Sequence, residues 1–158
     1  MRIEAFLAPG LPTVVGDGIQ IQQVLLNLLR NAVEAMTGAG GRRQLQVVTR
    51  AAGADGVEIA VRDTGPGVPP ELSDVIFDPF VSSKEGGLGM GLSISRTIVE
   101  SHHGRLWATA NAEGGMTFRI ELPGQDPAHE TPVGRAVASE APADDAAVVC
   151  RGASPAER

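Results

Sequence analysis

The stretch "GGLGMGLSIS", residues Gly86–Ser95, places four glycines within six positions and then leads into a predicted helix. Glycine loses more backbone entropy on folding than any other residue, so such a cluster rarely arises from packing alone. The free N–H groups and the dipole at the start of a helix favour phosphate oxygens. The stretch therefore predicts either a phosphate-binding loop or a flexible loop without a ligand.

Two common nucleotide-binding motifs do not fit this loop. The pattern G-x-x-x-x-G-K-[ST] is absent, and Leu92 stands where G-x-G-x-x-G requires its last glycine. Phe77 and Phe80 precede the loop, together with Lys84, the only lysine of the chain. We interpret the segment as a lid that is anchored by aromatic residues. A core role for the phenylalanines and a surface role for Lys84 fit the pattern equally well.

Composition and charge limit the classes of function. Of 158 residues, 42% are hydrophobic and 20% are charged, which is typical of a water-soluble domain with one core. The net charge of −6 and the lack of a basic tract argue against a nucleic-acid partner. The sequence shows neither an apolar run of membrane-spanning length nor a signal peptide, so we expect a cytoplasmic chain without membrane contact. A single cysteine, Cys150, excludes an internal disulfide.

The composition changes near Pro123. Residues 1–123 are predicted to form one α/β domain, whereas residues 124–158 are rich in Ala, Pro and Asp and are predicted to be a disordered tail or linker. In the domain, Asp17 is expected to cap the first helix, and Gly104 is expected at position C′ after the second. Strands are predicted at 2–8, 43–52, 56–63, 105–110 and 114–123, and helices at 19–36 and 92–104.

The first predicted helix carries a polar stripe that contains two asparagines one turn apart, Asn27 and Asn31. Asparagine is a poor residue for a helix interior, and an ordinary solvated face uses Lys, Glu and Arg instead. Amide oxygens are good ligands for a hard cation such as Mg²⁺. The stripe therefore fits a metal–triphosphate site, with a solvated face as the alternative. Its members are Gln20, Gln23, Asn27, Arg30, Asn31 and Glu34.

Asp63 ends a predicted strand and is followed by Gly65 and Gly67 in "VRDTGPGVP". A carboxylate at this place can accept a hydrogen bond from the exocyclic amine of adenine, and the glycines allow the backbone to approach the base. An ordinary turn is the alternative, because Asp, Gly and Pro are common turn residues.

Together, the four segments resemble the N, G1, F and G2 boxes of the catalytic ATP-binding domain of sensor histidine kinases. The matching stretches, in order, are "QVLLNLLRNAVEAM", "VRDTGPGVP", "IFDPFVSSK" and "GLGMGLSISRTIVESHHGRLWA". "GGMTFRIELP" resembles the closing strand of that family. The resemblance implies a Bergerat-type fold, which is a two-layer α/β sandwich with a mixed sheet, helices on one face and a glycine-rich ATP lid.

The resemblance also implies the cofactors ATP and Mg²⁺ and a set of contacts. Asn31 would coordinate Mg²⁺, with Asn27 on the triphosphate side, and both would be catalytic. Glu34 stands where some relatives carry a basic phosphate-binding residue, so Arg30 or Arg96 would have to replace it. The implied nucleotide-binding residues are Asn27, Asn31, Asp63, Gly65, Gly67, Phe80, Lys84, Gly87, Leu88, Gly89, Met90, Gly91, Leu92 and Thr117.

The implied activity is transfer of the γ-phosphate to a histidine of a dimerisation hairpin, with a response regulator as further partner. Gyrase-like ATPases place a water-activating glutamate where this chain has Asn27, so slow hydrolysis is expected. The hairpin is expected in trans or upstream, because neither His102–His103 nor His129 lies in a suitable helical segment. The alternatives are a serine kinase of the anti-sigma-factor type and a nucleotide-binding module without transferase activity.

Overall fold

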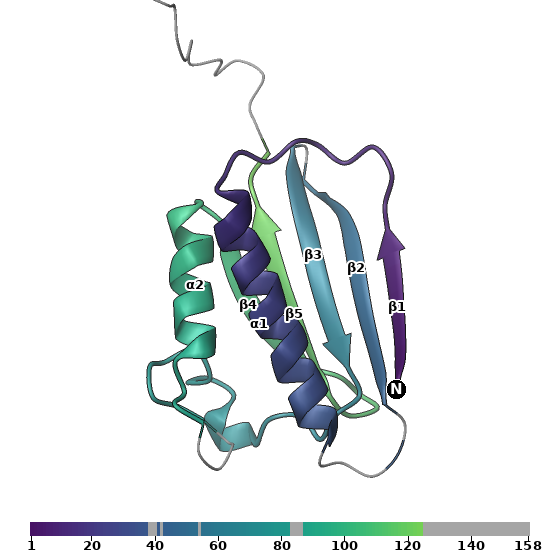
Figure 1. Cartoon of the computed structure of the whole chain (residues 1–158), viewed down its shortest axis with the longest axis vertical. Helices are drawn as coiled ribbons and strands as arrows, with labels where there is room; N and C mark the ends of the chain where they lie inside the picture. Colours follow the sequence, from purple (N-terminus) through teal and green to yellow (C-terminus); the bar gives the residue numbers. More distant parts are fainter. Residues whose placement is uncertain (38–40, 42, 54, 83–86, 125–158) are drawn as a thin grey trace, which may run out of the picture.

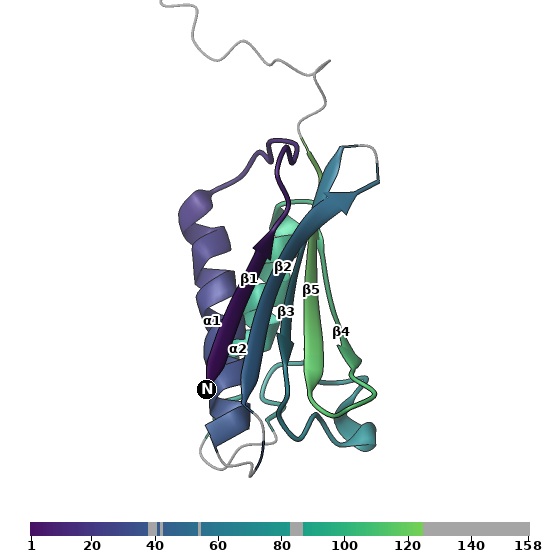
Figure 2. The ribbon, with the colours of Figure 1, turned by 90° about the vertical axis from the view of Figure 1, so that its right-hand side faces the viewer.

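The computed structural model describes residues 1–37, 41, 43–53, 55–82 and 87–124, and these form a five-stranded mixed sheet with two α-helices on one face (Figures 1 and 2). The strand order is β1-β2-β3-β5-β4, with β1 parallel to β2 and all other neighbours antiparallel. The expected sandwich is confirmed. The elements are β1 (Arg2–Leu7), α1 (Gly18–Thr37), β2 (Gln44–Ala52), β3 (Gly56–Asp63), the 3₁₀ turn η1 (Pro70–Leu72), α2 (Gly91–Ser101), β4 (Arg105–Ala110) and β5 (Met116–Leu122).

The register of the strands places one continuous apolar layer under the helices. Val47 pairs with Val61, and Val61 pairs in turn with Phe118. Because side chains alternate between the two faces of a strand, these residues share the helix-covered face. The apolar face of α1 closes the core with residues at intervals of four: Val24, Leu28, Ala32 and Met36.

The first helix begins at the predicted cap. Oδ1 of Asp17 accepts hydrogen bonds from the N–H groups of Ile19 at 2.9 Å and Gln20 at 3.2 Å. These two bonds satisfy donors that the helix itself leaves unpaired. Asp17 therefore determines where α1 starts.

The end of the second helix differs from the prediction by one residue. The cap is His102, His103 follows with φ 58°, and the N–H groups of His103 and Gly104 bond to the carbonyls of Glu100 and Val99 at 2.9 Å each. This hydrogen-bond pattern is a Schellman motif in which His103 occupies C′ and Gly104 occupies C″. The expectation of Gly104 at C′ is wrong. The helix is capped by His102, so His103 is the residue that takes C′, and Gly104 follows it at C″.

His102 joins the two helices at this end. Its Nε2 accepts the backbone N–H of Asp17 at 2.9 Å, and its Nδ1 lies 2.8 Å from the carbonyl oxygen of Ile98, to which it donates as the neutral ring. Since the start of α1 meets the end of α2, the two helices run antiparallel (Figure 1).

The described part of the chain ends just beyond β5, at Gly124, which forms an isolated bridge with Val14. The predicted tail from residue 125 onward, with His129 and Cys150, lies outside the described residues, as does Lys84. None of the described helices has both the length and the apolarity needed to cross a membrane.

Candidate functional site

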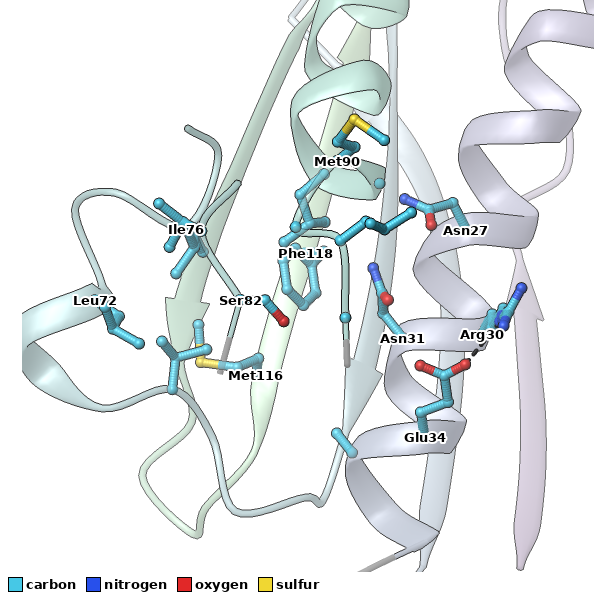
Figure 3. Close-up of a pocket in the computed structure, with 18 of the residues that line it drawn as sticks. Asn27, Arg30, Asn31, Glu34, Leu72, Ile76, Ser82, Met90, Met116 and Phe118 are labelled. Carbon is cyan, nitrogen blue, oxygen red and sulfur yellow. Dashed lines mark hydrogen bonds and ion pairs between the residues drawn. The ribbon is translucent and has the colours of Figure 1, made fainter. Parts of the chain in front are cut away.

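A pocket of about 380 Å³ opens between α1, the end of β3, the segment after it and residues 87–92. One wall is the polar stripe of α1, and in Figure 3 the two asparagines of this stripe point toward Met90 and Phe118. From Asn27 onward, the stripe therefore forms a wall of the pocket. Four of its members line the pocket: Asn27, Arg30, Asn31 and Glu34.

Charge on this wall is partly balanced within the helix. Nε of Arg30 lies 2.7 Å from Oε1 of Glu34, an ion pair between residues four apart (Figure 3). The Arg30 side chain is 80% exposed, so the pair adds little to stability and can rearrange around a ligand. Arg96, the other suggested substitute for a basic residue, instead stacks over the Phe77 ring at 5.7 Å and pairs with Glu100.

Asn27 is held from the side of α2. Its Nδ2 donates to Oγ of Ser95 at 2.9 Å, and Ser95 is only 2% exposed. The sequence pattern alone does not mark Ser95 as a site residue. The available signal is a hydroxyl residue four positions after Gly91, on the face that α2 turns toward the core.

The other end of the pocket is formed by Asp63, which is 3% exposed. Its Oδ1 accepts hydrogen bonds from the N–H groups of Gly65 at 2.8 Å and Met116 at 3.3 Å. Both bonds use Oδ1, so Oδ2 is the oxygen that remains for a ligand. Burial raises the pKa of Asp63, whereas the two backbone hydrogen bonds act in the opposite direction.

The glycine-rich stretch covers the pocket between these ends, and residues 87–92 all line it. Gly89 has φ +65°, and its carbonyl oxygen accepts the N–H of Phe80 at 3.0 Å, which joins the stretch to the preceding segment. Met90, the residue before α2, provides no side-chain cap. The first N–H groups of α2 are therefore suited to bind an anion from the pocket.

Most of the predicted nucleotide-binding residues gather at this pocket, with four exceptions. Gly65 bonds to Asp63 but does not line the cavity, and Phe80 is 78% exposed and is not one of the lining residues. Lys84 is outside the described residues. Thr117 lies on the opposite face of β5 from the pocket-lining Met116 and Phe118, and its hydroxyl donates to Oδ1 of Asn111 at 2.6 Å.

The alternation of side chains along β5 explains this placement of Thr117. When Phe118 faces the helices, its neighbour Thr117 must face away from them. Met116 is the residue that reaches both the pocket and Asp63. Phe77 is half-buried and packs against the core, where its ring meets Phe118 edge to face with 6.4 Å between the ring centroids.

Comparisons with known proteins agree with this geometry. Residues 16–126 match the family model described as histidine kinase-, DNA gyrase B- and HSP90-like ATPase. The chain is 49% identical over 126 residues to the sensor protein FixL of Bradyrhizobium diazoefficiens, covering 80% of this chain and 25% of FixL. The chain thus spans about a quarter of the length of this relative.

Solved structures show the same architecture. Full-length ShkA in complex with AMPPNP superposes with a TM-score of 0.67 at 30% identity, covering 77% of this chain and 25% of ShkA. Histidine kinase ThkA in complex with the response regulator protein TrrA gives 0.63 at 32% identity, covering 78% of this chain and 34% of ThkA. The chain therefore belongs to the family of histidine kinase-, DNA gyrase B- and HSP90-like ATPases, as a catalytic ATP-binding domain of the sensor histidine kinase type.

Proposed function

We propose that this chain binds Mg²⁺–ATP in the pocket along α1 and presents the γ-phosphate to a histidine on another segment or chain. One observation carries the proposal: a single cavity is lined by two asparagine amides, whose oxygens suit a cation, and by a buried carboxylate. Asn27, Asn31 and Ala35 lie on successive turns of α1 and line this cavity. The eight helical steps from Asn27 to Ala35 span about 12 Å at about 1.5 Å per residue.

The two ends of this cavity suit different parts of a nucleotide. Near Ala35, Asp63 offers Oδ2 to the exocyclic amine of adenine. Near Asn27, the uncapped start of α2 and the amide of Asn31 suit a triphosphate with its Mg²⁺ ion. Asn31 is the proposed metal ligand, and Lys84 is the proposed lysine of the lid. The relative ShkA was crystallised in complex with AMPPNP, which supports the proposal that the pocket of this chain binds a nucleotide.

The chemistry that the pocket supports is transfer rather than hydrolysis. Phosphoryl transfer depends mainly on positioning and on neutralising the charge of the γ-phosphoryl group. Asn27 stands where a water-activating glutamate would be needed, and an amide does not act as a base near neutral pH. When bound, Mg²⁺ would neutralise charge on the phosphate groups, and Asn27 and Asn31 would hold the ion's side of the nucleotide.

The proposed partners are a dimerisation hairpin that carries the acceptor histidine and a response regulator. The crystallisation of the relative ThkA with TrrA supports the second partner. We propose that the phosphoryl transfer to these partners takes place in the cytoplasm. Residues 1–123 form the proposed catalytic domain, and residues 124–158 are the proposed tail or linker.

The test combines binding and transfer. The full chain is titrated with ATP by calorimetry, with Mg²⁺ and with EDTA, and is then incubated with labelled ATP and a histidine-containing hairpin. We expect Mg²⁺-dependent binding and a labelled hairpin whose phosphate is lost in acid. Acid-stable label would indicate a serine kinase instead, and binding without transfer would indicate a nucleotide-binding module.

A matched pair of variants ties the result to the pocket. Asn31→Ala should abolish the Mg²⁺ dependence of ATP binding, whereas Gln22→Ala, on an exposed position of the same helix, should not alter it. An unchanged Mg²⁺ response in Asn31→Ala would contradict the metal role.

A further inference from the structure

The contact between Asn27 and Ser95 joins residues 68 positions apart in the sequence, across the interface of α1 and α2. Ser95 is the buried polar residue of α2, with an exposed fraction of 2%, and Val99 lies one turn further along the same buried face. A buried hydroxyl costs free energy unless it is hydrogen-bonded. The amide of Asn27 supplies that partner at 2.9 Å.

Gly91 completes the surroundings of this amide. A Cβ atom added to Gly91 would lie 2.7 Å from Oδ1 and 3.1 Å from Nδ2 of Asn27. Gly91 has no positive φ, so a side chain at this place would disturb the position of the Asn27 amide rather than the backbone conformation. Gly91 and Ser95 are four residues apart and therefore share one face of α2. We call this pair the amide seat.

We infer that Ser95 is a positioning residue that holds the amide of Asn27 at a fixed place on the pocket wall. An asparagine amide can turn by 180° and exchange its donor and acceptor atoms with little change of shape. The serine hydroxyl can both donate and accept, so a hydrogen bond to Ser95 persists in either orientation, and the bond fixes the place of the amide rather than its orientation.

The place of the amide specifies where Asn27 would act on the proposed ligand, because Asn31, the proposed metal ligand, lies one turn further along the same wall. An amide oxygen can face a cation or the water molecules around it, whereas an amide N–H group would face phosphate oxygens. The seat therefore holds Asn27 beside Asn31, at the end of the pocket proposed for Mg²⁺ and the triphosphate. This inference rests on the proposed function, because it concerns the same nucleotide. It adds a residue outside the matched N box to the determinants of Mg²⁺ dependence.

The test measures Mg²⁺ dependence and not activity. The ATP affinity of the full chain is determined by calorimetry with Mg²⁺ and with EDTA for the wild type, Ser95→Ala and Thr97→Ala. Thr97 is an exposed residue of α2 whose hydroxyl bonds within the helix to the Ser93 carbonyl, so it serves as the matched control. Loss of one hydrogen bond predicts that Ser95→Ala weakens binding with Mg²⁺ about 3- to 10-fold. Binding in EDTA should be unchanged, and Thr97→Ala should match the wild type in both conditions.

A double-mutant cycle separates positioning from a general packing role. In an Asn27→Ala background, Ser95→Ala should have no further effect on the affinity for Mg²⁺–ATP, because the residue it positions is gone. Ser95→Thr, which keeps the hydroxyl, should retain most of the wild-type Mg²⁺ dependence. An equal loss with Mg²⁺ and with EDTA, or a loss that persists in the Asn27→Ala background, would overturn the inference.

A second pair of variants tests the glycine of the seat. Gly91→Ala should displace Asn27 and lower the affinity for Mg²⁺–ATP by at least the same factor. Gly18→Ala, at the first residue of α1, has no atom within 4 Å of the added Cβ and should be silent. If the wild type bound no ATP, the proposed function would fail together with this inference. If the wild type bound Mg²⁺–ATP and all seat variants behaved like it, only the inference would fail.

Discussion

Replacing Asp63 by Asn is the sharpest perturbation of the proposed adenine contact. The amide keeps Oδ1 as acceptor for the N–H groups of Gly65 and Met116, so the buried hydrogen bonds of the free protein survive. It replaces Oδ2, the oxygen left for a ligand, by an NH₂ group. In the proposed complex this donor would face the donor amine of adenine.

The expected size of the effect follows from these contacts. A hydrogen bond to a charged acceptor contributes about 1.5–3 kcal/mol, and an unpaired buried donor adds a further penalty. We expect a loss of about 3 kcal/mol in ATP binding, which corresponds to roughly a 100-fold weaker affinity. Because a carboxylate buried to 3% exposure is replaced by a neutral amide, the free energy of unfolding should change by less than about 1 kcal/mol.

The assay is calorimetric titration with ATP and with GTP, next to chemical unfolding of the free protein. Guanine presents an acceptor, O6, where adenine presents its amine. Asp63→Asn should therefore lose affinity for ATP but not for GTP. Asp17→Asn, the same chemical change at the start of α1, is the control and should bind ATP normally.

An ATP affinity of Asp63→Asn within about threefold of the wild type, with the fold intact, would refute the adenine assignment. Asp63→Ala is a weaker test. It leaves the N–H groups of Gly65 and Met116 buried without their acceptor, at about 1–3 kcal/mol each, so lost binding could reflect damage to the fold.

Three further predictions address pH, the glycine-rich stretch and the joint between the helices. Burial raises the pKa of Asp63 above its ordinary 3.8, so its contribution to stability is complete below about pH 3.8 and is lost as pH rises through the folded-state pKa. ATP affinity should fall on acidification through that same folded-state pKa, and a pH-independent affinity would contradict the role of the carboxylate. Gly89→Ala places a Cβ 2.6 Å from the carbonyl carbon of Phe80 and should weaken ATP binding, whereas Gly10→Ala, at φ +67° with open space, should cost only about 1 kcal/mol of stability; equal effects on binding would argue against a lid. His102→Ala should lower the free energy of unfolding by about 1–2 kcal/mol, measured by urea denaturation, because the N–H of Asp17 loses its acceptor; no change would show that the joint is dispensable.

The local elements of this protein are readable from the sequence, because their signals lie within a few residues of one another. The spacing of Val24, Leu28, Ala32 and Met36 is sufficient to predict α1, and Asp17 marks its start. The polar stripe and the order of the four boxes are likewise properties of the linear chain. They point to the pocket wall before any tertiary contact is known.

The end of α2 shows where local reading becomes unreliable. A glycine after a helix suggests C′, yet His103 adopts the left-handed conformation and Gly104 follows it. Which residue adopts the left-handed conformation depends on which N–H groups reach the last carbonyls of the helix. Composition does not encode the difference between His103 and Gly104 as that residue.

Contacts between distant elements were settled only by the tertiary structure. Thr117 and Met116 are neighbours in sequence, and only the pairing of β5 with β3 determines that Met116 meets Asp63 while Thr117 turns to Asn111. The hydroxyl of Ser95 meets the amide of Asn27 because two helices pack antiparallel at one particular depth. Periodicity reports which face of an element is apolar, whereas the partner of each polar atom depends on register and packing between elements, and these exist only once the chain has folded.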